Sequence, residues 1–122
     1  MEPSKSFEDL TVWQKAHQLT LQIYKLTRGF PKHELYGLTS QIRRAASSVP
    51  SNIAEGYSLR GTQEKLKFFN YAYSSLEETR YQLILARDLD YADTSETSNL
   101  AIEVSKLINA YTAAISRNQG NS

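Results

Sequence analysis

The stretch QIRRAASSVPSNIAEGY, residues 41–57, decides the fold, because it has the pattern of one amphipathic helix although Pro50 lies inside it. Its apolar residues share one face of a helical wheel, and that face keeps its phase from Ile42 to Ile53, past the proline. We therefore expect the helix to continue through Pro50 with a kink. A proline in a helix interior removes one amide donor and crowds the carbonyl of Ala46, which costs about 3 kcal/mol in an ideal helix.

The backbone groups that Pro50 frees need other partners. We expect the side chains of Ser47, Ser48 and Asn52 to supply them. The alternative is a true break with Asn52 as a new N-cap, but too few residues follow it for a second stable helix. The helix is predicted over residues 33–57, and its buried face comprises Leu35, Leu38, Ile42, Ala45, Ala46, Val49, Ile53 and Gly56.

Three further segments show the 3.6-residue periodicity of helices, over about residues 9–28, 62–89 and 94–117. The apolar arc of the first of them includes Tyr24. No segment alternates apolar and polar residues as a strand does. Because short connections make successive helices antiparallel neighbours, the sequence predicts an all-α fold. The predicted fold is an antiparallel up-down-up-down four-helix bundle, with residues 1–122 as a single domain.

The composition narrows the class of protein. A chain of 122 residues has the size of one domain, and without cysteine it has no disulfide, no Cys-ligated zinc and no thiol nucleophile. No apolar run reaches the ~18 residues of a membrane span, and residues 1–10 contain no apolar core of a signal peptide. We therefore expect a cytoplasmic protein.

No recognisable catalytic or metal-binding pattern is present. The two histidines, His17 and His33, lack the spacing of a metal site, and no glycine-rich loop precedes a Lys-Ser or Lys-Thr pair. Glu77 and Glu78 are adjacent, so on a helix they diverge by ~100° and do not act as a pair. We expect no catalytic residues, no metal, no cofactor and no small-molecule substrate, and hence a protein that is not an enzyme.

Charge is unevenly distributed along the chain. Residues 1–34 carry five Lys/Arg and four Asp/Glu, residues 35–70 five and two, and residues 71–122 four and seven. Ordinary solvated helix faces explain this pattern; the two sharper alternatives are a basic surface for nucleic acid and opposite patches that meet between identical subunits. The candidate nucleic-acid contacts are the basic residues that we assign to the corner between the second and third helices, near Tyr57: Arg43, Arg60, Lys65 and Lys67.

A row of polar side chains lies beside the apolar face of the second predicted helix. Steps of three and four residues place them along one edge. They are Gln41, Arg44, Ser48, Asn52 and Glu55. We interpret this edge as a hydrogen-bonded border between helices or between subunits that sets register, ahead of a catalytic groove. Arg43 points away from it, toward solvent or a ligand.

The third predicted helix has more apolar surface than its own bundle needs, since a helix of a monomeric bundle requires a single apolar stripe. The residues on its two extra flanks are Leu66, Tyr71, Tyr73, Ile84, Leu85 and Leu89. We expect another copy of the chain to cover them, so that the protein is a homo-oligomer.

Three motifs resemble those of one protein family. FEDLTVWQKA, YGLTSQIRRAASSVPSNIAEGY and LILARDLDY are similar to the four-helix-bundle protein family, also called the 23S rRNA intervening-sequence protein family. Two residues of the third helix depart from the family pattern: Ser74 stands where a glycine is expected, and Arg80 where an acid is common. The most specific matches are Gln41, Arg43, Arg44, Ala45, Ala46, Ser48, Pro50, Asn52, Ile53, Ala54, Glu55 and Gly56.

The resemblance extends over about residues 7–117 and implies an antiparallel bundle that assembles into a ring, with a pentamer favoured. Family members are often encoded within insertions in bacterial large-subunit ribosomal RNA genes. A related group, the accessory variability determinant of diversity-generating retroelements, is thought to bind nucleic acid and the reverse transcriptase through basic surfaces. The resemblance implies no catalytic residues. The implied partners are other copies of the chain, RNA or DNA, and a nucleic-acid enzyme; the alternative is a pure protein–protein interaction scaffold.

Overall fold

Four long helices form the protein, which we describe from a computed structural model over residues 5–120, the last two as backbone only. The helices are, in chain order, α1 (Thr11–Thr27), α2 (Leu38–Ser58), α3 (Thr62–Asp88) and α4 (Ser95–Gly120). Two 3-10 turns, η1 (Phe7–Asp9) and η2 (Lys32–Glu34), precede α1 and α2. The part of the chain that the structure describes contains no strand, so the prediction of an all-α fold is confirmed.

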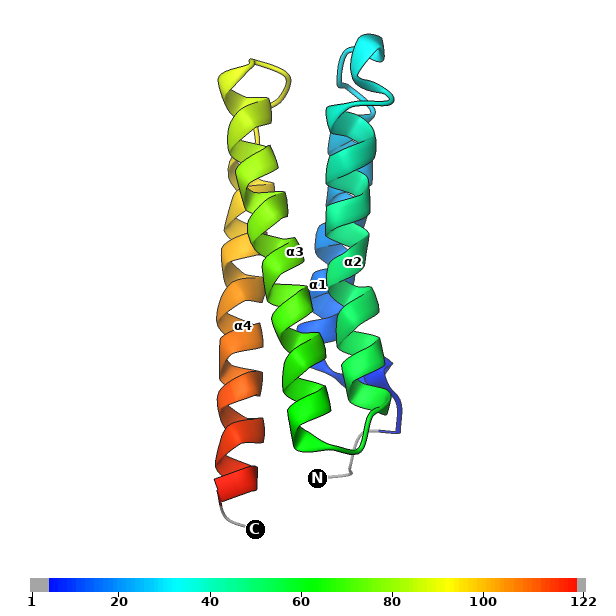
Figure 1. Ribbon diagram of the computed structural model, residues 1–122. Helices are drawn as coiled ribbons and strands as arrows, with labels where there is room; N and C mark the ends of the chain where they lie inside the picture. Colours follow the sequence, from blue (N-terminus) through cyan, green and yellow to red (C-terminus); the bar gives the residue numbers. More distant parts are fainter. Residues whose placement is uncertain (1–4, 121–122) are drawn as a thin grey trace.

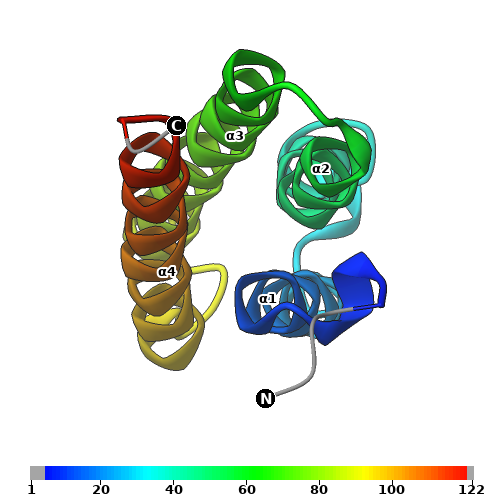
Figure 2. The same ribbon diagram turned by 90° about the horizontal axis from the view of Figure 1, so that it is seen from below.

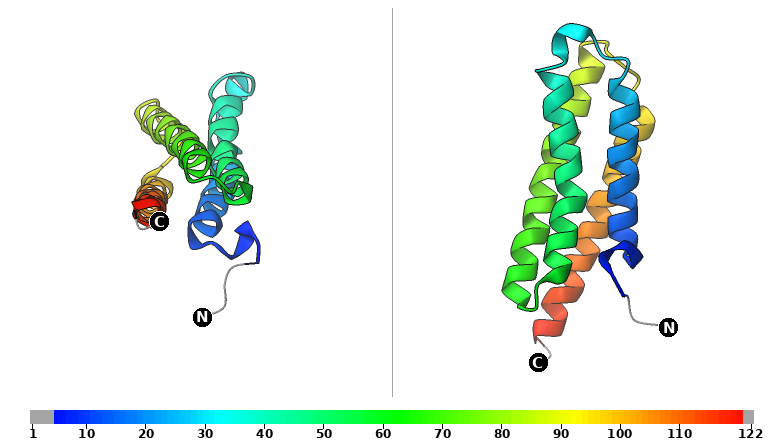
Figure 3. Two further views of the ribbon diagram at one scale, coloured as in Figure 1. Left: turned by 60° about the horizontal axis from the view of Figure 1, so that its bottom comes forward. Right: turned by 90° about the vertical axis from the view of Figure 1, so that its right-hand side faces the viewer.

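The helices stand around the core as the corners of a square. In Figure 1 the chain runs up α1, down α2, up α3 and down α4. Figure 2, viewed from below, shows that α1 and α3 each pack against both α2 and α4, across the sides of the square. The right-hand view of Figure 3 places η2 and the α3–α4 connection at one end of the bundle and the α2–α3 turn at the other. We call these the η2 end and the α2–α3 end.

Aliphatic side chains from all four helices fill the interior. The apolar face predicted for α2 is buried from Leu38 to Gly56, with Pro50 on the same buried side. The largest side chains that are fully buried include Leu19, Ile23, Ile42, Ile53, Phe69, Leu76, Leu83 and Ile108. Leu35 does not belong to this face: α2 begins at Leu38 rather than near residue 33, and Leu35 is 50% exposed.

Glu34 fixes the later start of α2. Its Oε1 accepts a hydrogen bond of 3.1 Å from the amide of Leu38, and its Oε2 accepts one of 2.7 Å from the Tyr91 hydroxyl in the α3–α4 connection. These two bonds lower the pKa of Glu34, the bond from Tyr91 most strongly. A Cβ on Gly37 would lie 2.6 Å from Oε1, so only glycine leaves room for this carboxylate.

Helix α2 runs through Pro50 without interruption, as its apolar phase predicts; the kink remains a prediction. The partner of the freed carbonyl differs from our expectation. The Thr20 hydroxyl on α1 lies 3.1 Å from the oxygen of Ala46 and 3.0 Å from that of Ala16, so its hydrogen is shared between them. The side chains of Ser47 and Asn52 instead bond carbonyls of the preceding turn of α2. Helix α1 thus supplies the partner that we expected from within α2.

Candidate nucleic-acid interface

Lys65 closes the C-terminal end of α2. Its Nζ donates hydrogen bonds to the backbone carbonyls of Gly56 (3.2 Å) and Tyr57 (3.0 Å) in the last turn of α2, where helix carbonyls lack the usual amide partner four residues on. The Gly56 carbonyl also accepts a bond of 3.3 Å from the amide of Leu59. The ammonium also lies 5.7 Å from the centroid of the Tyr57 ring. The positive charge is therefore held at the negative end of the α2 dipole, where it stabilises the turn into α3.

Two further cations belong to the same α2–α3 end of the bundle. Arg60, in the turn, is exposed and makes no hydrogen bond or ion pair within residues 5–118. Lys67 is exposed as well, with its Nζ 5.9 Å from the centroid of the Tyr71 ring. Residues 59–71 contain three Lys/Arg and a single acid, Glu64. The turn thus carries a local excess of positive charge that no opposite charge in the described chain neutralises by an ion pair.

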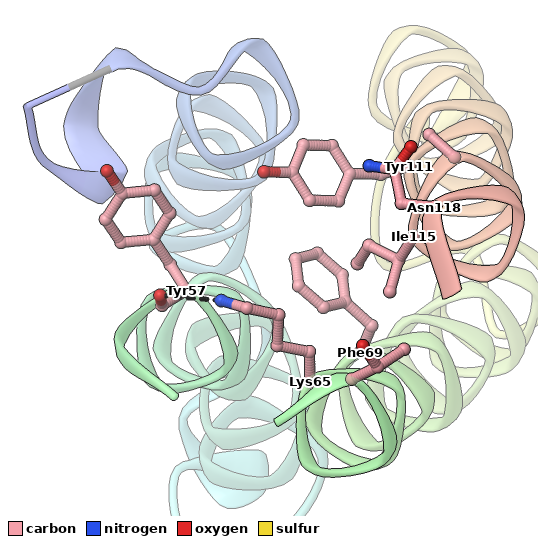
Figure 4. A pocket seen from close by; sticks show the side chains of 8 residues that line it. Tyr57, Lys65, Phe69, Tyr111, Ile115 and Asn118 are labelled. Atoms are coloured by element: carbon pink, nitrogen blue, oxygen red, sulfur yellow. Dashed lines mark hydrogen bonds between the residues drawn. The ribbon is translucent and has the colours of Figure 1, made fainter. Parts of the chain in front are cut away.

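A cavity of about 410 Å³ opens next to Lys65 (Figure 4). Three helices build it: α2 contributes Tyr57, α3 contributes Lys65 and Phe69, and the last turns of α4 contribute Tyr111. The remaining lining residues are Thr62, Ala114, Ile115 and Asn118. This volume and a mostly apolar, aromatic lining with few polar groups are typical of sites for small organic groups.

The aromatic side chains of the cavity are ordered by contact with one another. Phe69 is fully buried and stacks on Tyr111, with ring centroids 4.9 Å apart and an interplanar angle of 19°. Tyr57 and Tyr111 are half-buried. Burial raises the pKa of the Tyr111 phenol, and the nearby Tyr57 raises it further. Tyr111 is therefore held neutral well above physiological pH, with a flat ring at the cavity wall.

Arg43 does not belong to this corner, so the predicted four-residue cluster is wrong in that respect. It lies early in α2, about 20 Å along the helix from the α2–α3 turn, given a rise of 1.5 Å per residue. It is half-buried rather than directed to solvent: its Nε donates to the Thr27 hydroxyl at 2.8 Å. Its guanidinium lies 4.8 Å from the centroid of the Tyr24 ring. Arg43 therefore attaches α2 to α1.

A second, more open groove lies beside Arg43 at the η2 end, and our sequence analysis missed it. Its apolar wall consists of Tyr24, Leu35 and Tyr36, which are 42%, 50% and 93% exposed. We had assigned Tyr24 and Leu35 to buried faces. For Leu35 the irregular backbone between α1 and α2, where periodicity no longer predicts orientation, explains the difference. Tyr24 lies within α1 but outside the buried face of that helix. We call these three residues the η2-end patch.

The polar edge of α2 separates into an inner and an outer part. The Ser48 hydroxyl lies 2.8 Å from that of Ser75 on α3, and the Asn52 amide donates to both the carbonyl and the hydroxyl of Ser48. These half-buried groups form a border between two helices of one chain, which is one of the two interpretations we gave. The outer members, Gln41, Arg44 and Glu55, are exposed.

The extra apolar residues of α3 also divide into two groups. Tyr73 and Leu85 pack against the core of their own bundle, and Leu66 is half-buried, so they are not free outer contacts. Three others remain largely exposed, and Tyr81, which we had not singled out, is 60% exposed. The exposed set, which we call the α3 surface, comprises Tyr71, Tyr81, Ile84 and Leu89.

Arg80 and Glu77 lie on α3 as well and form an ion pair of 2.8 Å. The arginine that departs from the family pattern therefore has an acid of its own helix as its partner. Over the described residues, no group of three His, Cys, Asp or Glu side chains is placed to hold a metal ion. None of the helices in this part of the chain is long and apolar enough to cross a membrane.

The structure is that of an all-helical bundle protein with a basic end, an aromatic cavity and exposed apolar patches. The model of the 23S rRNA-intervening sequence protein family matches residues 8–112, and the chain belongs to this family. No protein of curated function matches it.

A solved structure shares the fold: the crystal structure of a protein with unknown function from the S23 ribosomal protein family of Bacteroides thetaiotaomicron. Its TM-score is 0.75 at 22% sequence identity, and the match covers 84% of this chain and 98% of that one. At this identity the similarity shows the fold alone.

Proposed function

We propose that the protein is a non-enzymatic binding protein that contacts RNA or DNA through the α2–α3 end. One observation carries the proposal: Arg60, Lys65 and Lys67 lie at the α2–α3 end, where Lys65 lines a cavity with aromatic walls, and none of the three forms an ion pair within the described chain. Lysine and arginine neutralise phosphates, and aromatic rings stack on bases. Lys65 is committed to the α2 carbonyls, so Arg60 and Lys67 are the side chains available to phosphates.

The test is a salt titration of binding to labelled single-stranded RNA and DNA, followed by fluorescence anisotropy. Each phosphate contact contributes about 0.7 to the negative slope of log K against log salt for a single strand. The double variant Arg60→Ala, Lys67→Ala should lower that slope by roughly 1 to 1.5. Arg28→Ala, which removes an exposed arginine that follows α1 at the η2 end of the bundle, is the matched control. Equal slopes for the wild type and the double variant refute the assignment.

We further propose that the chain self-associates head to tail in a closed ring, with a pentamer as the expected size. The support is that two different apolar patches, the α3 surface and the η2-end patch, are exposed on one subunit. A two-fold interface pairs one patch with itself, whereas a head-to-tail interface pairs two different patches. The charge fits this pairing, because the η2-end patch lies beside Arg43 and Arg44, and the last third of the chain is acidic.

Two single variants distinguish these arrangements by light scattering. Ile84→Glu on the α3 surface and Tyr36→Glu on the η2-end patch should each break a head-to-tail ring. An equimolar mixture should then form a heterodimer, because each variant keeps one intact patch. Gln18→Glu, at an exposed polar position of α1, is the control. A wild type that is monomeric at micromolar concentration refutes self-association, and a Tyr36→Glu variant that still assembles refutes the head-to-tail pairing.

The second candidate is a protein-interaction scaffold that does not bind nucleic acid. The exposed outer part of the polar edge favours it, since Gln41 and Arg44 border a shallow groove of about 220 Å³ together with Glu78 of α3. A complex that survives nuclease treatment and is lost in Arg44→Ala, while oligonucleotides fail to bind, supports this alternative.

A further inference from the structure

The cavity at the α2–α3 end has aromatic walls, and phosphate binding by the nearby cations does not explain why they are there. Phosphate binding needs only exposed positive charge, yet here three aromatic side chains from three helices converge beside that charge (Figure 4). Phe69 is inaccessible behind Tyr111, so the ring surfaces that a ligand meets are those of Tyr57 and Tyr111. A planar group that enters the cavity therefore meets aromatic surface, while its charged attachments stay at the rim.

The cavity also offers polar atoms that have no partner. The Thr62 hydroxyl and the Asn118 amide make no hydrogen bond within the described chain, although both line the cavity. Lys65 uses two of its three N–H donors on the α2 carbonyls and keeps one. An amide offers both a donor and an acceptor, which is the pairing that the edge of a nucleobase presents.

We propose that this cavity holds one unpaired base of a single-stranded nucleic acid, with the flanking phosphates at Arg60 and Lys67. The base lies against the Tyr57 and Tyr111 rings, and its edge meets Thr62 and Asn118. A base inside a duplex does not reach such a cavity without unpairing, so the site selects single strands, loops or ends. The inference rests on the proposed function, because Arg60 and Lys67 at the same end of the bundle supply the contacts that bring the strand to the cavity.

The experiment compares three short strands of one sequence: one with 2-aminopurine at its centre, one with an abasic position there, and the first annealed into a duplex. Fluorescence of 2-aminopurine reports stacking, and anisotropy reports affinity. We expect quenching when the single strand binds, and affinity lower by roughly tenfold or more for the abasic strand and the duplex. Both the RNA and the DNA versions are measured.

Variants localise the effect. Ala114→Phe fills the cavity from α4 and should abolish both the quenching and the preference over the abasic strand. Ala113→Phe places the same side chain on the exposed side of α4 and should change neither. Asn118→Ala, which adds no volume, tests the edge contact without the risk of misfolding, and should reduce the preference for a base.

The outcomes separate the two proposals. If salt-dependent binding is present but 2-aminopurine stays bright and the abasic strand binds equally well, the base site is wrong and the basic surface stands. If no strand binds at all, the proposed function fails as well. A free nucleoside monophosphate that binds in the cavity while oligonucleotides do not shows a nucleotide site and overturns the assignment to a strand.

Discussion

The hydrogen bond from Thr20 to Ala46 should be unusually important for stability, because Pro50 leaves that carbonyl without its helical amide partner. Thr20→Val keeps the shape of the side chain and removes the donor. A buried carbonyl without a partner costs about 1–3 kcal/mol, so we expect the free energy of unfolding to fall by that amount. In a chain of this size each kcal/mol corresponds to roughly 3–5 °C in Tm.

Urea unfolding followed by far-UV circular dichroism measures this loss, and two comparisons make it specific. Thr79→Val removes a hydroxyl that is equally buried, but its acceptor, the carbonyl of Ser75, keeps the amide of residue 79, so the cost should be smaller. Pro50→Ala restores an amide to Ala46. In that background Thr20→Val should cost at least about 1 kcal/mol less than in the wild type. An equal cost in both backgrounds refutes the reasoning.

Three further effects follow from contacts described above. Gly56→Ala should destabilise by up to about 2 kcal/mol, because a Cβ there lies 3.2 Å from the buried Phe69 ring and overpacking outweighs the gain in helix propensity. Tyr91→Phe should make the free energy of unfolding less sensitive to acid as the pH falls below the ordinary pKa of a glutamate, about 4.3. The bond from Tyr91 lowers the folded pKa of Glu34, so its contribution is present above the unfolded pKa and is lost as pH falls through the folded one. Arg43→Ala should cost about 1 kcal/mol, because it removes the bond to α1 and the contact with the Tyr24 ring.

Each of these has its own control. Gly29→Ala meets no atom closer than 3.7 Å and should be tolerated, so an equal loss at both glycines argues against the packing explanation. For Tyr91→Phe, chemical unfolding across the pH range is the measurement, and parallel curves contradict the assignment. Arg43→Gln keeps part of the hydrogen bonding and should fall between the wild type and Arg43→Ala.

Periodicity predicted the helical segments well, because the apolar residues of a helix recur every three to four positions regardless of which neighbour they pack against. The phase from Ile42 to Ile53 was enough to carry α2 through the proline. Periodicity did not predict what surrounds each helix. The partner of the Ala46 carbonyl lies on α1, and no local pattern in α2 contains it.

The same limit applies to the site. The sequence indicated the three cations near the α2–α3 turn, because they are close together along the chain. Tyr111 could not be assigned to their cavity, since it follows Lys65 by more than forty residues and meets it only when α4 packs. Arg43 was placed wrongly because it is near Arg60 in sequence but distant along a rigid helix. Leu35 and Tyr36 precede α2 in an irregular segment, where a helical wheel has no meaning.

The proline in α2 also distinguishes correct from incorrect packing of α1. If α1 slid along α2 by one turn, Thr20 would move by about 5.4 Å and the Ala46 oxygen would have no donor. If α1 carried valine or leucine in place of Thr20, the Ala46 oxygen would have no hydrogen-bond donor in any register. Without the proline, a slipped pairing of these two helices would keep all its backbone bonds. The missing amide therefore destabilises only the wrong alignments of α1 and α2, because only the native one gives the Ala46 carbonyl a donor.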